Sequence, residues 1–355
     1  MNKIFLTQLL NANSPSGYET AATDIFSREM NHAGLDFEFR DEIGNCVYAI
    51  GYGKTDFMLS GHIDQIGLQV QYVDDKGFIY FITDGGIDPK TLPGSVVTII
   101  TKKGNIKGVI GKTPIHIEWR DESKDKALKV KELKIDIGAS NKEEALNLIQ
   151  IGNPIIVDHP TFFLNDYRLT GGGIDDKIGV FVTAEVMKLL REDERKGKNL
   201  NSLRVYGVAC TQEEVGGNGA TLAARNINPA YSIDYDVTFA TDDDCVSPKE
   251  WGDVKLGYGG CIAHGPDKDV EMCDDIANVC KECGIPYQEF SVGAGMTNTN
   301  KIRLASSNCK TLLLSIPERN MHTPVEICDM RDVDSLIRMT YHYIKELDRK
   351  LDKRC

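Results

Sequence analysis

Residues 203–227 read LRVYGVACTQEEVGGNGATLAARNI, and this stretch decides the fold. It opens with an apolar run, LRVYGVAC, of the kind that forms a strand buried inside a sheet. A polar turn follows, and residues 217–227 then show the spacing of a helix. A buried strand that leads through a polar turn into a helix is typical of a layered α/β sheet.

The same alternation of strands and helices recurs on both sides of this stretch. A first helix is expected within residues 16–34, where Ser16 and Glu19 have the spacing of a capping box and Gly34 provides a stop. Other strands are expected at residues 45–50, 56–61, 231–242 and 311–317, and other helices at 179–196, 270–283 and 333–351. These elements predict an α/β domain with helices layered on its sheet, an α/β/α arrangement.

The chain between Leu68 and Phe163 has a different character. Short β-rich runs such as VVTIIT and PIIV are broken by Gly and Pro, and only one clear helix is expected, at residues 141–152. This composition predicts a small β-barrel or sandwich inserted into the α/β domain. The inserted domain would comprise residues 67–164, and the α/β domain residues 1–66 and 165–355.

Composition and charge limit the kinds of molecule that the protein is expected to bind. The 355 residues include 53 acidic and 41 basic side chains, and the net charge of -12 argues against a nucleic-acid or anionic-membrane partner. The N-terminus lacks the pattern of a secretory signal, and no run approaches the ~18 apolar residues that a membrane span requires. Ten cysteines without a dense framework suit reduced thiols. We therefore expect a cytoplasmic protein.

Glu213 and Glu214 raise a chemical question, because two adjacent carboxylates repel each other at pH 7 unless positive charge lies close. Acidic residues or histidines also follow, or lie near, the ends of the other predicted strands, where α/β proteins bind their ligands. An Asp inside a core strand is unusual, since charged residues are depleted there. The residues in question are His62, Asp175, Glu214, Asp236 and His322.

These five residues offer mixed nitrogen and oxygen ligands, which suit two divalent metal ions, zinc first, with cobalt or manganese as alternatives. Three carboxylates and a bridging hydroxide would neutralise the two cations, so the group would tolerate burial. Asp64 lies two residues after His62, where its carboxylate can orient the imidazole. An ordinary role also stays open, because an Asp pair such as Asp175–Asp176 suits a helix N-terminus.

Several ordered blocks now carry a resemblance to a known family. SGHIDQIGLQV, IDIGASNKEEAL, IDDKIG, TQEEVGGNGA, DVTFATD and PERNMHTPVE occur in this order along nearly the whole chain. The sequence resembles the cocatalytic metallo-aminopeptidases of the glutamyl aminopeptidase and tetrahedral (deblocking) aminopeptidase family, some members of which were formerly labelled endoglucanases. The resemblance therefore implies a layered α/β/α metallopeptidase domain with an inserted β-barrel-like domain.

The resemblance also implies roles for the site residues. His62 and Asp236 would hold one ion, Glu214 and His322 the other, and Asp175 would bridge them. The interval of 22 residues between Glu214 and its Asp partner favours Asp236 over Asp234 and Asp242. Asp64 would orient His62. Glu213 would act as general base and acid, which answers the question raised by the adjacent glutamates.

The implied activity is the removal of the N-terminal residue from short peptides with a free N-terminus. The inserted domain would form dimers, and the dimers would assemble into a tetrahedral dodecamer. Asn298 stands where relatives have Asp, in the segment GMTNTN, and Asn320 stands where they have Tyr. Both substitutions bear on the pocket for the substrate side chain.

Three other functions compete with this one. A metal-dependent deacylase or amidase of the same fold would use the same ligands. A glycosidase would use paired carboxylates but has no need of His62 or His322. A catalytically silent oligomeric relative would have no need of Glu213.

Overall fold

The computed structural model describes residues 1–118, 128–293 and 297–353. Gly295 and Met296 of the GMTNTN segment lie outside these ranges. The chain forms two compact units. The α/β unit comprises Met1–Asp64, Pro160–Met321 and Val325–Cys355, and the barrel unit comprises Gln65–His159 and His322–Pro324.

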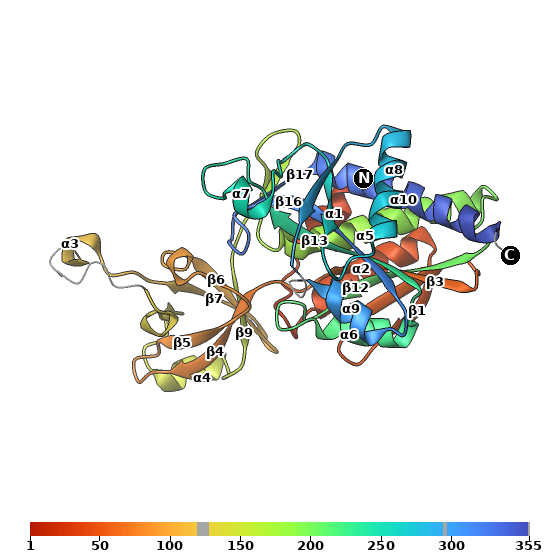
Figure 1. Cartoon of the computed structure of the whole chain (residues 1–355). Coiled ribbons are helices and arrows are strands. Elements are labelled where there is room, and N and C mark those ends of the chain that lie inside the picture. The colour runs from red at the N-terminus through yellow and green to blue at the C-terminus, as the bar shows by residue number, and fades with distance from the viewer. Residues whose placement is uncertain (119–127, 294–296, 354–355) are drawn as a thin grey trace. The chain divides into compact units, whose positions relative to one another are not determined.

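An 11-stranded sheet forms the centre of the α/β unit (Figure 1). Its main path runs β1-β2-β12-β3-β13-β16-β17-β11-β10, and β14 and β15 extend it from β16. The four central strands β12, β3, β13 and β16 are parallel. The strands are β1 (Asp36–Arg40), β2 (Cys46–Ile50), β3 (Thr55–His62), β10 (Phe162–Phe163), β11 (Arg168–Gly171), β12 (Leu203–Cys210), β13 (Tyr231–Phe239), β14 (Gly260–His264), β15 (Tyr287–Ser291), β16 (Lys310–Arg319) and β17 (Glu326–Asp329).

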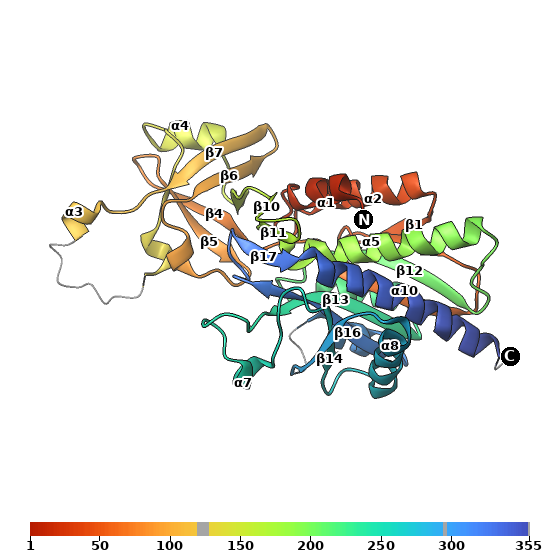
Figure 2. The ribbon, with the colours of Figure 1, turned by 90° about the horizontal axis from the view of Figure 1, so that it is seen from above.

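Helices cover both faces of this sheet. Figure 2 shows α1, α2, α5 and α10 together across one face, where their apolar side chains join those of the strands in one large core. Helices α6 and α9 pack on the other face around a smaller core. The helices are α1 (Lys3–Leu10), α2 (Thr20–Ala33), α5 (Ile174–Arg195), α6 (Asn218–Ile227), α7 (Pro248–Trp251), α8 (Val270–Cys283), α9 (Asn298–Ala305) and α10 (Met330–Asp352). The predicted α/β/α layering is confirmed.

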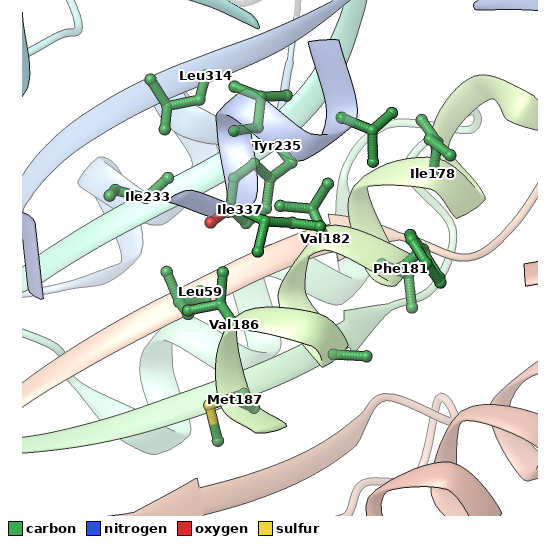
Figure 3. Packing of buried hydrophobic residues seen from close by; sticks show 14 of the residues in the cluster. Leu59, Ile178, Phe181, Val182, Val186, Met187, Ile233, Tyr235, Leu314 and Ile337 are labelled. Atoms are coloured by element: carbon green, nitrogen blue, oxygen red, sulfur yellow. The ribbon is translucent and has the colours of Figure 1, made fainter. Parts of the chain in front are cut away.

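Helix α5 lies very close to the central strand β3. Its apolar face, with Phe181, Val182 and Val186, packs on side chains of the strands (Figure 3). A Cβ added to Gly61 of β3 would lie only 2.6 Å from the backbone carbonyl carbon of Gly179. Glycine is therefore required where the helix backbone meets the strand backbone.

The barrel unit is a closed six-stranded barrel in the order β4-β5-β8-β7-β6-β9. Branched and aromatic side chains such as Val70, Phe81 and Ile99 fill its interior. Its strands are β4 (Gly67–Val73), β5 (Ile79–Asp84), β6 (Val96–Thr101), β7 (Gly104–Ile110), β8 (Ile135–Asp136) and β9 (Pro154–Val157), and its helices are α3 (Ile115–Glu118) and α4 (Lys142–Leu148). A small barrel is one of the two architectures that the sequence predicts, so this part of the fold is confirmed too.

The capping box predicted for the first helix is wrong. Helix α2 begins at Thr20, and Glu19 at its N-cap makes no side-chain cap bond. The Ser16 hydroxyl instead donates to Asp64 at 2.6 Å. The side chains of Ser16 and Glu19 are both buried, and their hydrogen bonds to residues distant in the sequence replace the local cap. None of the helices in the described ranges is both long enough and apolar enough to cross a membrane.

Candidate active site

The site is built at the carboxyl end of the parallel strands. His62 is the last residue of β3, and it pairs with Cys210, the last residue of β12. Asp236 lies on the next strand, β13, beside Ser315 of β16. Parallel pairing therefore brings the imidazole, the turn that follows β12 and the acidic β13 to one edge of the sheet.

Three predicted ligands converge at this edge. His62, Asp175 and Glu214 each offer one ligand atom, and these atoms all lie within 4.8 Å of one another. The Nε2 atom of His62 is 2.9 Å from Oδ1 of Asp175. His62 and Asp175 are buried and Glu214 is half-buried. Imidazole and carboxylate donors in such proximity are the set that zinc and similar divalent ions use, so these residues fit such an ion.

The loop that begins helix α5 aims Asp175 at His62. Asp175 and Asp176 fall within the first turn of the helix but have non-helical backbone angles. The Glu326 carboxylate accepts hydrogen bonds from the N–H groups of Ile174, at 2.8 Å, and Asp175, at 3.3 Å. Asp176 accepts from the His62 N–H at 3.2 Å and from the Gly179 N–H at 3.1 Å. The loop is thereby tied to both β3 and β17.

Asp64 has a larger role than the one the sequence predicts. The Nδ1 atom of His62 lies 3.1 Å from the backbone oxygen of Asp64 and 3.5 Å from its carboxylate. The same carboxylate accepts from the Ser16 hydroxyl and from two backbone N–H groups, those of Glu213, at 3.0 Å, and Glu214, at 3.2 Å. One buried carboxylate thus contacts both the imidazole and the turn that carries the two glutamates.

The protonation of these groups follows from burial and charge. Burial alone would lower the pKa of His62, but hydrogen bonds with Asp175 and Asp64 outweigh it and raise that pKa well above its ordinary value. Burial opposes ionisation of Asp64, yet the bonds from His62 and Ser16 lower its pKa. For Asp236, burial and the nearby Asp175 both raise the pKa. Acidic groups therefore crowd this edge of the sheet, as they do where cations bind.

The other predicted site residues occupy varied positions. Asp236 is buried, and its Oδ1 accepts from the N–H of Val237 at 2.8 Å. Glu213 is half-buried next to Glu214. His322 is grouped with the barrel unit, where its Nδ1 lies 2.7 Å from the backbone oxygen of Gly86. The three-residue ligand group found in the described ranges contains neither Asp236 nor His322.

Sequence reasoning missed two buried glutamates in this region. Glu326 on β17 fixes the Asp175 loop, as described above. Glu318 on β16 is 1% exposed, and neither of its carboxyl oxygens has a hydrogen-bond partner among the described residues. Burial and the nearby Glu326 raise the pKa of Glu318 well above its ordinary value. Glu318 directly follows the strand expected at residues 311–317, which was a signal for it, whereas Glu326 lies in a stretch for which no strand was predicted.

Comparison with known proteins identifies the family of the chain. Residues 44–339 match the family model of the M42 glutamyl aminopeptidases. The chain is 33% identical over 349 residues to the lysyl aminopeptidase of Pyrococcus furiosus, and the match covers 96% of each protein.

Solved structures extend this likeness to three dimensions. A TET aminopeptidase from a Thaumarchaeota archaeon of marine sediment aligns with a TM-score of 0.90 at 28% identity, covering 97% of this chain and 96% of that one. The TET1 peptidase of Pyrococcus horikoshii aligns with a TM-score of 0.85 at 30% identity, covering 96% and 98%. The predicted resemblance is confirmed: the chain belongs to the M42 glutamyl aminopeptidase family and is a metal-dependent aminopeptidase.

Proposed function

We propose that this aminopeptidase uses two divalent metal ions to remove the N-terminal residue from short peptides. The observation that carries the proposal is the convergence of His62, Asp175 and Glu214, whose ligand atoms lie within 4.8 Å of one another. His62 precedes Asp175 by 113 positions and Glu214 follows later still, so their meeting is a product of the fold.

The proposed ligand set contains the five residues identified from the sequence. His62 and Asp236 would hold one ion, Glu214 and His322 would hold the other, and Asp175 would be the fifth ligand. Zinc is the first choice, and cobalt and manganese are the alternatives, because all three accept imidazole and carboxylate ligands. Bound ions of this kind lower the pKa of a water molecule and polarise the scissile carbonyl.

Glu213 moves the proton in this proposal. It takes a proton from the attacking water and returns it to the leaving amine, as a general base and then a general acid. The Asp64 carboxylate supports this role, because its bond to the Glu213 N–H at 3.0 Å fixes the backbone from which the side chain extends. The adjacent bond to the Glu214 N–H fixes the ligand in the same way.

Assembly and compartment complete the proposal. The P. horikoshii relative assembles into a tetrahedron or a large octahedral shell. We place this chain in a homo-oligomer of the same kind, built from dimers that meet through the barrel unit and close into a tetrahedral dodecamer. The cytoplasm is the proposed compartment, because nine cysteines of the described ranges are unpaired, which is typical of reducing conditions.

A peptide-release assay tests the function. Peptides with free N-termini are incubated with the enzyme as purified, after chelation, and after zinc, cobalt or manganese is restored. We expect stepwise loss of N-terminal residues, none after chelation, and recovery with metal. N-acetylated copies of the peptides are the control: their cleavage would favour a deacylase. Internal cleavage, or unchanged rates in chelator, would contradict the proposal.

A further inference from the structure

The turn between β12 and α6 is held in an unusual way. Four consecutive residues, Thr211 to Glu214, each donate their backbone N–H to a buried side-chain oxygen. The acceptors are Asn45 at 2.9 Å, Glu19 at 3.2 Å and the two carboxylate oxygens of Asp64 at 3.0 and 3.2 Å. Backbone groups of a turn are often satisfied by water or by neighbouring backbone, whereas these four amides are bound by side chains from outside the turn.

Glu19 reaches this turn across 193 positions of sequence. It is only 4% exposed, and its Oε1 accepts from the N–H groups of Gly17, at 2.7 Å, and Gln212. Although Glu19 occupies the N-cap position of α2, its side chain makes no bond to the first turn of that helix. The Glu19 side chain therefore does not cap α2.

The residue that Glu19 holds is strained. Gln212 has a φ of 57°, the left-handed region that non-glycine residues rarely adopt. Such a conformation persists only where the surroundings impose it. Gln212 directly precedes Glu213, so its backbone angle sets the direction in which both glutamates leave the strand.

Asn45 holds the opposite side of the same turn. Its Oδ1 accepts from the Thr211 N–H, and its Nδ2 donates to the backbone oxygen of Gly219 at 2.8 Å. Both ends of residues 211–219 are thus bound to one buried amide. The Gln212 N–H donates to Glu19, whereas the N–H groups of Thr211, Glu213 and Glu214 donate to other side chains. A change at Glu19 therefore removes the bond to Gln212 and leaves those other bonds in place.

We propose that Glu19 is a positioning residue: through its bond to Gln212 it holds the turn that presents Glu213 and Glu214. This inference rests on the proposed roles of those two glutamates. Glu19 itself acts as a hydrogen-bond acceptor, so an uncharged side chain of the same shape fulfils its role.

Three full-length variants test this inference. Glu19→Ala removes the acceptor. Glu19→Gln keeps an amide oxygen at the same place but removes the charge. Glu42→Ala is the matched control, because Glu42 is exposed and accepts none of the bonds to the turn. Each protein is measured for kcat and KM on a peptide substrate, for melting temperature, and for amide hydrogen exchange of residues 211–217 with and without chelator.

For Glu19→Ala we expect kcat to fall about 10- to 100-fold, as when other partners behind active-site ligands are removed, with KM little changed. Exchange of residues 211–217 should accelerate even in chelator, where activity plays no part. Glu19→Gln and Glu42→Ala should resemble the wild type in both measurements.

Two results would overturn the inference. Glu19→Gln as impaired as Glu19→Ala would mean that charge, rather than the bond, matters. Wild-type exchange and kcat in Glu19→Ala would mean that the turn holds itself. Failure of the proposed function has a different signature, because the wild type itself would then release no N-terminal residues, while the exchange comparison would still report on the turn.

Discussion

Glu213 and Glu214 are neighbours in the chain for which we propose separate tasks. Glu214 belongs to the group with His62 and Asp175, and both glutamate N–H groups are bound to Asp64. The shared carboxylate fixes both backbones, which suits the proposed division in which Glu214 binds metal and Glu213 transfers the proton.

The first prediction concerns Glu213→Gln. An amide cannot accept the proton of the attacking water, so kcat should fall about 10²- to 10⁴-fold. Metal content and melting temperature should stay as in the wild type, since Glu214 keeps its place. Steady-state kinetics and metal analysis check this, with exposed Glu250→Gln as the control. A variant that keeps its activity would remove Glu213 from the mechanism.

Local pattern predicted many elements almost to the residue. Strand β12 and helix α8 have the bounds expected from their sequences, because a run of buried apolar residues or a helical stripe is a strong local signal. Helix α9 escaped prediction, since its sequence NTNKIRLA has few apolar positions. The side chains of Ser16 and Glu19 failed as a cap because their partners come from distant strand ends.

At the scale of elements, the contact between β3 and α5 gives a second prediction. Gly61→Ala places a methyl group 2.6 Å from the Gly179 carbonyl carbon and the Val180 nitrogen. The helix must shift, so the free energy of unfolding should fall by about 1–3 kcal/mol. Denaturant unfolding measures this. Gly111→Ala, with open space around it, is the control and should unfold like the wild type.

The start of helix α10 gives a third prediction. The buried Asp332 accepts from the N–H groups of Gly257 and Gly259, both at 2.7 Å. Burial raises its pKa from 3.8 to about 6, although these bonds oppose the rise. An acid whose pKa is higher in the folded state contributes stability below pH 4 and loses it as the pH rises through 6.

The free energy of unfolding of the wild type should therefore fall by up to about 3 kcal/mol over this pH range. Asp332→Asn has no carboxyl group at this position and should not show this loss. The amide offers one acceptor in place of two, so the variant should be less stable at pH 5. The difference in stability between Asp332→Asn and the wild type should become smaller towards pH 8. Melting curves across that range check this, with the exposed Asp352→Asn as the control. A deficit independent of pH would contradict the assignment.

At the scale of the whole molecule, the sequence predicts where strands end but not which strands are adjacent in the sheet. The sequence places His62 and Cys210 at the ends of two strands, whereas only the sheet order shows that these strands are adjacent and in register. Non-local pairing of this kind leaves no periodic trace in the chain. The family resemblance supplied the grouping that pattern reasoning lacked.

A fourth prediction concerns assembly. Light scattering on the purified protein should give a mass about twelve times the 39.4 kDa of the chain, if dimers close into a tetrahedral shell as proposed. Dilution should not dissociate it readily, because closed assemblies bury several interfaces per subunit. A monomer at micromolar concentration would contradict the proposed dodecamer.

The point at which the chain leaves the α/β unit has a practical consequence. That unit's first segment ends at Asp64, and the barrel unit starts with the next residue. A chimera that exchanged the barrel for that of a relative would have its natural splice one peptide bond from the carboxylate that holds Glu213 and Glu214. The junctions of such a chimera should therefore lie several residues inside the barrel, so that a structural mismatch at a junction does not displace Asp64 or the two glutamates.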